Sequence, residues 1–327
     1  SDGEMSKIAF NAYAKERLNG LGALGPRGAS KEGQSASFGA PLDLVEHADP
    51  GAPRPSMASR FAQWSRNDGP ISYKGQAQVK RDIENMQAAL AGSGAVEGFL
   101  TAASPGALST VFGEGYYATY EEYVFAIADA MREEYKIIAN AGLVLQLDSP
   151  DLAMERHMKF GPKTDEEFKG IVRLHVDALN RATQGLPREQ LRVHVCWGNY
   201  PGPHTHDIPL QEILDILLTA QVGALSIEAS NPRHEHEWRL FEQVKLPDEM
   251  ILIPGVIDSC TPYVEHPELV AERITRLARL VGRDRVIAGS DCGFGTFAGA
   301  GILSQSIVWA KLQSLAEGAA LASKELF

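Results

Sequence analysis

From residue 70 onward, short runs rich in apolar and β-branched residues alternate with longer segments of helical periodicity. This alternation is typical of a parallel sheet, because parallel strands need long crossover connections, which helices usually provide. Strands are predicted over Ile71–Tyr73, Val96–Ala102, Leu143–Leu147, Leu191–Val195, Ala224–Ile227, Met250–Ile257 and Arg285–Ala288. Helices are predicted over Tyr120–Ala141, Phe168–Ala182, Leu210–Ala220, His266–Val281 and Ser304–Leu326.

Two of these helices carry clear boundary signals. Thr164 followed by Glu167 is a capping box, in which each side chain binds a backbone N–H group of the other residue. Pro267 suits a first helical turn, because proline lacks the N–H group that would be unpaired there. Gly282 follows the same segment and favours its end.

The pattern predicts an α/β fold, and specifically a (β/α)8 TIM barrel that forms one domain over residues 1–327. Such a barrel has eight strands, so the remaining strand is expected just before Ser1. An open doubly wound sheet is the alternative, but no early strand is followed by a Gly-rich nucleotide fingerprint. Residues 20–70 are rich in Gly, Pro and Ser and are interpreted as a long excursion, with a short helix around Met57–Ser65.

The charge balance excludes several classes of partner. Lys and Arg total 31 and Asp and Glu total 42, a net charge of -11, which argues against nucleic-acid and anionic-lipid surfaces. No apolar run reaches the roughly 18 residues of a membrane span. Three cysteines are too few for a disulfide framework and suit a reducing cytoplasm. We expect small-molecule partners and leave a homo-oligomer open.

All three cysteines follow predicted strands, which is where a barrel builds its active site. His194 and Cys196 are two positions apart at the end of one strand, so their side chains face the same side. Glu228 and Cys292 follow two other strands. Two thiolates, an imidazole and a displaceable carboxylate make a tetrahedral Zn²⁺ site of the catalytic kind. The alternative is that the cysteines are small apolar core residues.

These motifs resemble the catalytic barrel of cobalamin-independent methionine synthase. The closer resemblance is to the single-barrel proteins that include epoxyalkane:coenzyme M transferases. In that family the residues matching His194-Val195-Cys196, Glu228 and Asp291-Cys292-Gly293 hold zinc. The resemblance also implies a fold of the uroporphyrinogen-decarboxylase and methionine-synthase type.

The resemblance extends to segments that bind the substrate in the family. Asp2-Gly3-Glu4 is similar to its Gly-Glu after the first strand, and Leu145–Pro150 is similar to its Leu-Gln-Ile-Asp-Glu-Pro. This implies that Glu4 and Asp148 hold the amino group of an amino-acid thiol. The strand ending at Asp258 resembles the one before the family's catalytic histidine, so Asp258 is expected at the substrate.

One departure affects the expected reaction. Where the family has Asp-Ile-His-Ser-Pro, this chain has Asp258-Ser259-Cys260-Thr261-Pro262, so a cysteine stands at the position of the general-acid histidine. A methylfolate donor is therefore not supported. His206, His234 and Cys260 are candidate acids, and Arg233 is a candidate anion-binding residue. We interpret His204-Thr205-His206-Asp207 as a polar loop, with a second metal site as the alternative.

The resemblance implies a zinc-dependent thiol alkyltransferase or methyltransferase that acts on a homocysteine-like or coenzyme M-like thiol. Three alternatives are open. They are a corrinoid-dependent thiol methyltransferase, a non-catalytic relative that binds a small thiol or anion, and a barrel hydrolase of the amidohydrolase kind. The last is disfavoured because its His-x-His motif follows the first strand, whereas His204-Thr205-His206 comes late in this chain.

Overall fold

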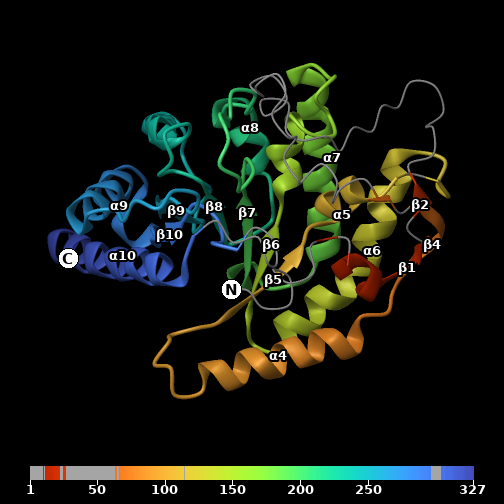
Figure 1. The fold of residues 1–327 in the computed structure, drawn as a ribbon, viewed down its shortest axis with the longest axis horizontal. Coiled ribbons are helices and arrows are strands. Elements are labelled where there is room, and N and C mark those ends of the chain that lie inside the picture. Colours follow the sequence, from red (N-terminus) through yellow and green to blue (C-terminus); the bar gives the residue numbers. More distant parts are fainter. Residues whose placement is uncertain are drawn as a thin grey trace.

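A parallel sheet of six strands forms the centre of the computed structural model, with its strands in the order β10-β9-β8-β7-β6-β5. The sheet curls, and helices lie along its outer side (Figure 1). The structure describes residues 10, 12–22, 25–26, 63–64, 66–113, 115–295 and 303–327. The strands are β5 (Phe99–Ala103), β6 (Val144–Asp148), β7 (Leu191–Val195), β8 (Ala224–Ile227), β9 (Ile251–Ile257) and β10 (Gly289–Ser290).

Helices connect these strands in the manner of a TIM barrel. They are α4 (Gln76–Leu90), α5 (Pro105–Val111), α6 (Tyr120–Asn140), α7 (Asp165–Thr183), α8 (Leu210–Leu217), α9 (Pro267–Val281) and α10 (Gln305–Leu326). Short 3-10 turns are η1 (Pro150–Leu152), η2 (Met154–Arg156), η3 (Arg188–Gln190), η4 (Glu235–Glu242) and η5 (Arg283–Arg285). No helix in the described part of the chain is long and apolar enough to cross a membrane.

The predicted α/β class and barrel type are confirmed, and so are the helix boundary signals. The Thr164–Glu167 capping box forms in both directions at the start of α7. α9 begins at Pro267 and ends before Gly282, whose φ of 107° is a backbone conformation that glycine adopts readily. The 15-residue helix α4 and the short helix α5 are not among the predicted helices.

The predicted strand Ile71–Tyr73 does not belong to the parallel sheet. It is the end of β4 (Asn67–Tyr73), which pairs antiparallel with β1 (Leu18–Leu21). Along β4 only the two terminal residues are buried, whereas β8 is buried throughout. A mostly exposed strand suits a two-stranded ribbon, while parallel strands covered on both faces are continuous apolar runs.

Two further predictions need correction. The segment Met57–Ser65 is predicted to be helical, but Gln63–Trp64 form β3, which pairs antiparallel with β2 (Gly25–Pro26). Residues 57–62 and 65 lie outside the described residues. The predicted strand Arg285–Ala288 makes only a single bridge, from Val286 to Leu252, and β10 begins at Gly289. Arg285 itself is in η5 and donates to the carbonyls of Met250 and Pro247, so it caps the start of β9 instead of extending a strand.

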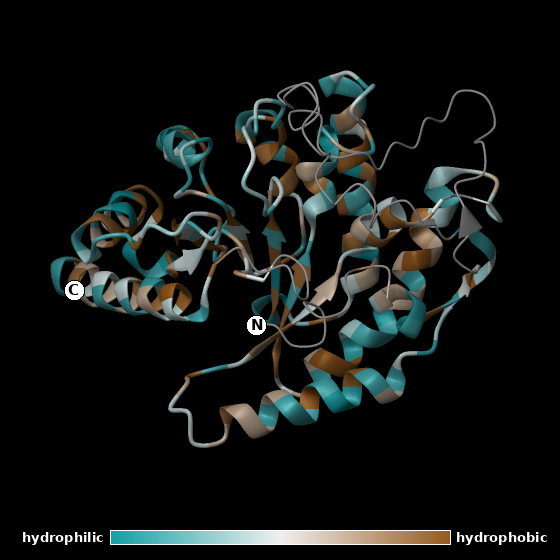
Figure 2. Ribbon diagram, viewed as in Figure 1, coloured by the Kyte–Doolittle hydropathy of each residue, from teal (hydrophilic) through white to brown (hydrophobic). Residues whose placement is uncertain are grey.

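The two faces of the sheet differ in polarity. Leu145 and Leu147 of β6 are fully buried in the core shared with the helices, and apolar residues follow the strands and inner helix faces in Figure 2. Gln146 and Asp148 alternate with them and are only partly buried. Asp148 is in register with His194 on β7, so polar groups gather on the face away from the helices.

Candidate metal centre

His194, Cys196 and Cys292 come together at the carboxyl ends of the strands. One donor atom from each lies within 4.8 Å of the others, and these residues form the metal-type group found among the described residues. His194 and Cys196 come from the end of β7, and Cys292 comes from the loop after β10. β8 and β9 separate these strands in the sheet, so it is the curl of the sheet that brings them together.

The environment of His194 fits a metal ligand. Its Nδ1 lies 3.2 Å from Oγ of Ser226, the residue in register with it on β8, which can hold the ring in one orientation. Its Nε2 is buried and has no hydrogen-bond partner. A buried nitrogen without a partner costs free energy unless something binds it, and zinc prefers an imidazole with thiolates. The three residues therefore fit zinc.

Glu228 lies beside this group but is not one of the three. Its Oε1 accepts a hydrogen bond from the backbone N–H of Trp197 at 2.9 Å, and its Oε2 accepts from the Asn231 side chain at 2.8 Å. Burial, reinforced by the charge of Asp291, raises the pKa of Glu228 to about 7. A carboxylate poised in this way can exchange between its hydrogen bonds and a metal.

Asp291 positions Cys292. Its side chain is buried and accepts hydrogen bonds at 2.9 Å from three consecutive backbone N–H groups, those of Ala229, Ser230 and Asn231. The residue before Cys292 thus fastens the loop that follows Glu228. Sequence reasoning placed Asp291 only within a motif and did not foresee this role, because the loop and Asp291 are about sixty positions apart.

Cys260 and Asp258 lie in the loop after β9. Oδ1 of Asp258 accepts from the backbone N–H of Cys260 at 2.8 Å, which forms a tight turn. The Cys260 thiol donates to Oδ1 of Asn199 at 2.9 Å. Burial, with the charge of Asp258, raises the pKa of Cys260 to about 12, so the thiol is neutral at pH 7.

Asn199 connects three loops, a role that the sequence did not suggest. Its Oδ1 also accepts from Ser259 at 3.0 Å, and its amide donates to the carbonyl of Gly293, the neighbour of Cys292. It comes three residues after Cys196. Polar asparagine so close to a strand end is the one signal that could have indicated a function.

The other predicted residues occupy different positions. Asp148 accepts from Gln146 at 2.8 Å, and burial raises its pKa. His234 is buried, with Nδ1 2.9 Å from Glu237 and Nε2 3.0 Å from Asp207, so both ring nitrogens are occupied. Arg233 is exposed, and His206 is partly buried in the loop after β7. Glu4 lies outside the described residues.

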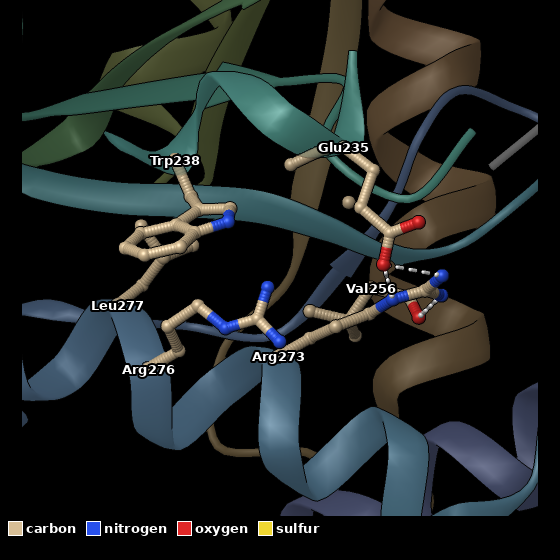
Figure 3. A pocket seen from close by; sticks show the side chains of 8 residues that line it. Glu235, Trp238, Val256, Arg273, Arg276 and Leu277 are labelled. Atoms are coloured by element: carbon tan, nitrogen blue, oxygen red, sulfur yellow. Dashed lines mark hydrogen bonds and ion pairs between the residues drawn. The ribbon is translucent and has the colours of Figure 1, made fainter. Parts of the chain in front are cut away.

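A small pocket lies on the helix side of β9, between η4 and α9 (Figure 3). Of its three charged residues, Arg273 and Glu235 pair with each other at 3.0 Å, and Arg276 pairs with Glu272. Arg273 also donates to the carbonyl of Val256. Arg276 lies over the ring of Trp238, 4.9 Å from its centre. These contacts fasten α9 to the sheet and to η4, and they leave the pocket without a free charged group among the residues that line it.

The parallel sheet of barrel type places this protein in the class of TIM-barrel proteins. In this class the functional sites lie in the loops after the strands, which is where the histidine and cysteines lie here. A family model described as the catalytic domain of cobalamin-independent synthase matches residues 69–306. The chain belongs to this family of cobalamin-independent methionine synthase catalytic domains.

Individual relatives agree with this assignment. The methionine synthase of Thermococcus kodakarensis is 28% identical over 212 residues, which are 64% of this chain and 53% of that protein. The 2-hydroxypropyl-CoM lyase of Xanthobacter autotrophicus is 24% identical over 246 residues, which are 67% of this chain and 60% of that protein. The chain therefore spans little more than half the length of these relatives.

A solved structure shows the same fold. It is the B12-independent methionine synthase from Shewanella sp. W3-18-1 in complex with selenomethionine, with a TM-score of 0.67 and 20% identity. The match covers 98% of this chain and 80% of that chain. At this identity the likeness establishes the architecture, and the residues at the strand ends must carry the argument for function.

Proposed function

We propose that this protein is a zinc-dependent thiol alkyltransferase, in which His194, Cys196 and Cys292 hold the metal. The observation that carries the proposal is their convergence around a buried imidazole nitrogen that has no partner. When bound, zinc keeps a coordinated substrate thiol deprotonated, and the thiolate is the nucleophilic form. Family membership and the names of the relatives support a reaction of this type.

Glu228 is proposed as the fourth, displaceable ligand. The backbone N–H of Trp197 and the side chain of Asn231 bind its oxygens, so the carboxylate would keep hydrogen-bond partners whether or not it held the metal. Once released, the carboxylate can accept the proton that the thiol gives up. The reaction then forms a sulfur–carbon bond and breaks the bond between that carbon and its leaving group.

The acceptor is proposed to be a homocysteine-like or coenzyme M-like thiol. Asp148, which faces the same side of the sheet as His194, would hold an amino group of the substrate, together with Glu4. Asp258 would lie on the opposite rim. Arg233 is exposed near the loop after β8 and would attract an anionic group. The alkyl donor is not proposed to be a methylfolate, because Cys260 replaces the family's general-acid histidine.

Protonation of the leaving group is assigned first to Cys260. It stands at the position of the family's general-acid histidine, and its thiol carries a proton at pH 7. Because a pKa of about 12 makes the thiol a weak acid, this role requires a strongly basic leaving group such as the alkoxide of an opening epoxide. His206 is the second candidate, in the loop after β7. His234 is the third, since its two ring nitrogens already bind carboxylates and its proton would have to leave an ion pair.

A cytoplasmic location is part of this proposal, because free thiol ligands persist in a reducing compartment. Corrinoid dependence and non-catalytic binding are the competing functions. Turnover of a thiol with an activated alkyl donor excludes the binder. Turnover without any methylated corrinoid protein excludes a corrinoid-dependent methyltransferase.

Elemental analysis of purified protein tests the metal centre. We expect about one zinc per chain, lost from both Cys196→Ser and Cys292→Ser together with activity. Cys260→Ser is the matched control and should keep its zinc. A zinc-free Cys292→Ser protein that still alkylates thiols would contradict the mechanism, and so would a parent protein that binds no zinc after remetallation.

A further inference from the structure

Asp207 is a buried carboxylate surrounded by three imidazoles. Its side chain is 2% exposed and lies in the loop after β7. Oδ1 is 3.2 Å from Nδ1 of His157, and Oδ2 is 3.0 Å from Nδ1 of His204 and 3.0 Å from Nε2 of His234.

The three histidines belong to the loops after three consecutive strands. His157 follows η2, beyond β6, while His204 shares the loop after β7 with Asp207. His234 precedes η4, beyond β8. One carboxylate therefore joins the loops that a barrel uses to build its site.

The imidazoles stabilise the charged form of this carboxylate. Although burial opposes ionisation, the three nearby imidazoles hold the pKa of Asp207 below its ordinary value. His204 and His234 are hydrogen bonded to the carboxylate, whereas Nδ1 of His157 lies 3.2 Å away as an ion-pair contact without hydrogen-bond geometry. A buried charge is tolerated only when it is paired and hydrogen bonded, so each ring depends on the carboxylate and the carboxylate depends on the rings. The ring nitrogens and carboxylate do not form a metal-type group in the described part of the chain.

The cluster is linked directly to the candidate metal centre through Trp197, the residue after Cys196. The ring of His234 packs against the Trp197 indole, with ring centres 4.2 Å apart. The indole N–H donates to the carbonyl of Ile208, the neighbour of Asp207, at 2.6 Å. The backbone N–H of Trp197 donates to Glu228. Asp207 is therefore connected, through His234 and Ile208, to Trp197, and Trp197 is connected in turn to Cys196 and Glu228.

We propose that Asp207 is a positioning residue for the metal centre, which fastens the loops after β6, β7 and β8 through three imidazoles and so fixes Trp197 between Cys196 and Glu228. The proposal rests on the proposed function, in that Cys196 and Glu228 are the groups it positions. It assigns no contact between Asp207 and the substrate.

The test is the rate at which a thiol reagent labels Cys196 in chelator-treated protein, mapped by peptide mass. Cys196 is buried in the parent, and Asp207→Asn is expected to raise its labelling rate about tenfold because the loops open more often. In zinc-loaded protein, the same variant should release zinc to a chelator about tenfold faster. His204→Gln removes one imidazole and should change both rates in the same direction by less.

Asp151→Asn is the matched control. Asp151 is equally buried, lies 2.9 Å from Nδ1 of His175 and accepts a hydrogen bond from Ser104. These partners differ from the residues that link Asp207 to Trp197. It should lower the melting temperature without changing Cys196 labelling. If Asp207→Asn and His204→Gln also leave the labelling unchanged, the positioning role is wrong. A parent without zinc would instead contradict the proposed function, because labelling is measured without metal.

Discussion

Gly255 on β9 decides, at the scale of single residues, how closely Asp291 can approach the sheet. A Cβ atom at this position would lie 2.0 Å from Oδ1 of Asp291 and 2.6 Å from its Cα and backbone N. The same oxygen accepts from the N–H groups of Ala229 and Ser230. The absence of a side chain at position 255 therefore allows the loop after β8 and Cys292 to take their places.

Gly255→Ala is expected to destabilise the protein and weaken zinc binding, because Asp291 and its backbone neighbours must shift. We expect a loss of about 2 kcal/mol in the free energy of unfolding, measured by urea denaturation, together with a lower zinc content. Gly170→Ala is the matched control. Gly170 lies inside α7 with open space around it, so alanine should be neutral or add up to about 1 kcal/mol.

Single substitutions can also decide which residue protonates the leaving group. If Cys260 protonates the leaving group, Cys260→Ser should keep its zinc and lose about 100-fold in kcat with little change in KM. His206→Gln and His234→Gln, measured in the same assay, should then have smaller effects on kcat. A larger loss in His206→Gln than in Cys260→Ser would reassign the proton donor.

At the scale of elements, α10 is held to the loop after β9 by a buried lysine. Lys311 is fully buried, and its ammonium lies 2.8 Å from Oε2 of Glu265. Oε1 of Glu265 accepts from the backbone N–H of Asp258 at 2.8 Å. The ion pair therefore connects the last helix to the turn that carries Asp258 and Cys260.

Lys311→Met is expected to lower the free energy of unfolding by about 3 kcal/mol, because it leaves Glu265 buried without its counter-charge. Urea denaturation measures this effect. Lys324→Met is the matched control, since Lys324 is exposed in the last turn of the same helix, and it should change stability by less than about 0.5 kcal/mol. Adding Glu265→Gln to Lys311→Met should restore part of the loss, and further destabilisation would contradict this account.

At the scale of the whole molecule, several buried groups bind protons more tightly in the folded chain. Burial raises the pKa of Glu155 to about 7 from an ordinary value of 4.5. For His234, burial lowers the pKa, but Asp207 and Glu237 outweigh it and raise the pKa to about 9. At pH values between the ordinary and the raised pKa of each group, the folded state holds a proton that the unfolded state has lost. Stability therefore falls as the pH rises.

Metal-free protein is expected to be most stable near pH 5 and to lose stability progressively toward pH 9, as these groups release their protons. Glu155 contributes between about pH 4.5 and 7, and its share is at most about 3 kcal/mol. Urea denaturation of the parent and of Glu155→Gln at pH 5 and pH 8 measures this. The variant should show a smaller fall between the two pH values, and an equal fall would exclude Glu155 as a source.

The sequence alone determined the alternation of strands and helices from β5 onward, the capping box of α7, the ends of α9 and the position of His194 and Cys196 on one face of a strand. These features depend on neighbours within a few residues, through capping, proline and the period of a strand. Only the tertiary structure decided that β4 pairs with β1, that Cys292 meets β7 and that Asp207 joins three loops. Such contacts join residues far apart in the chain, and their geometry depends on how the sheet curls.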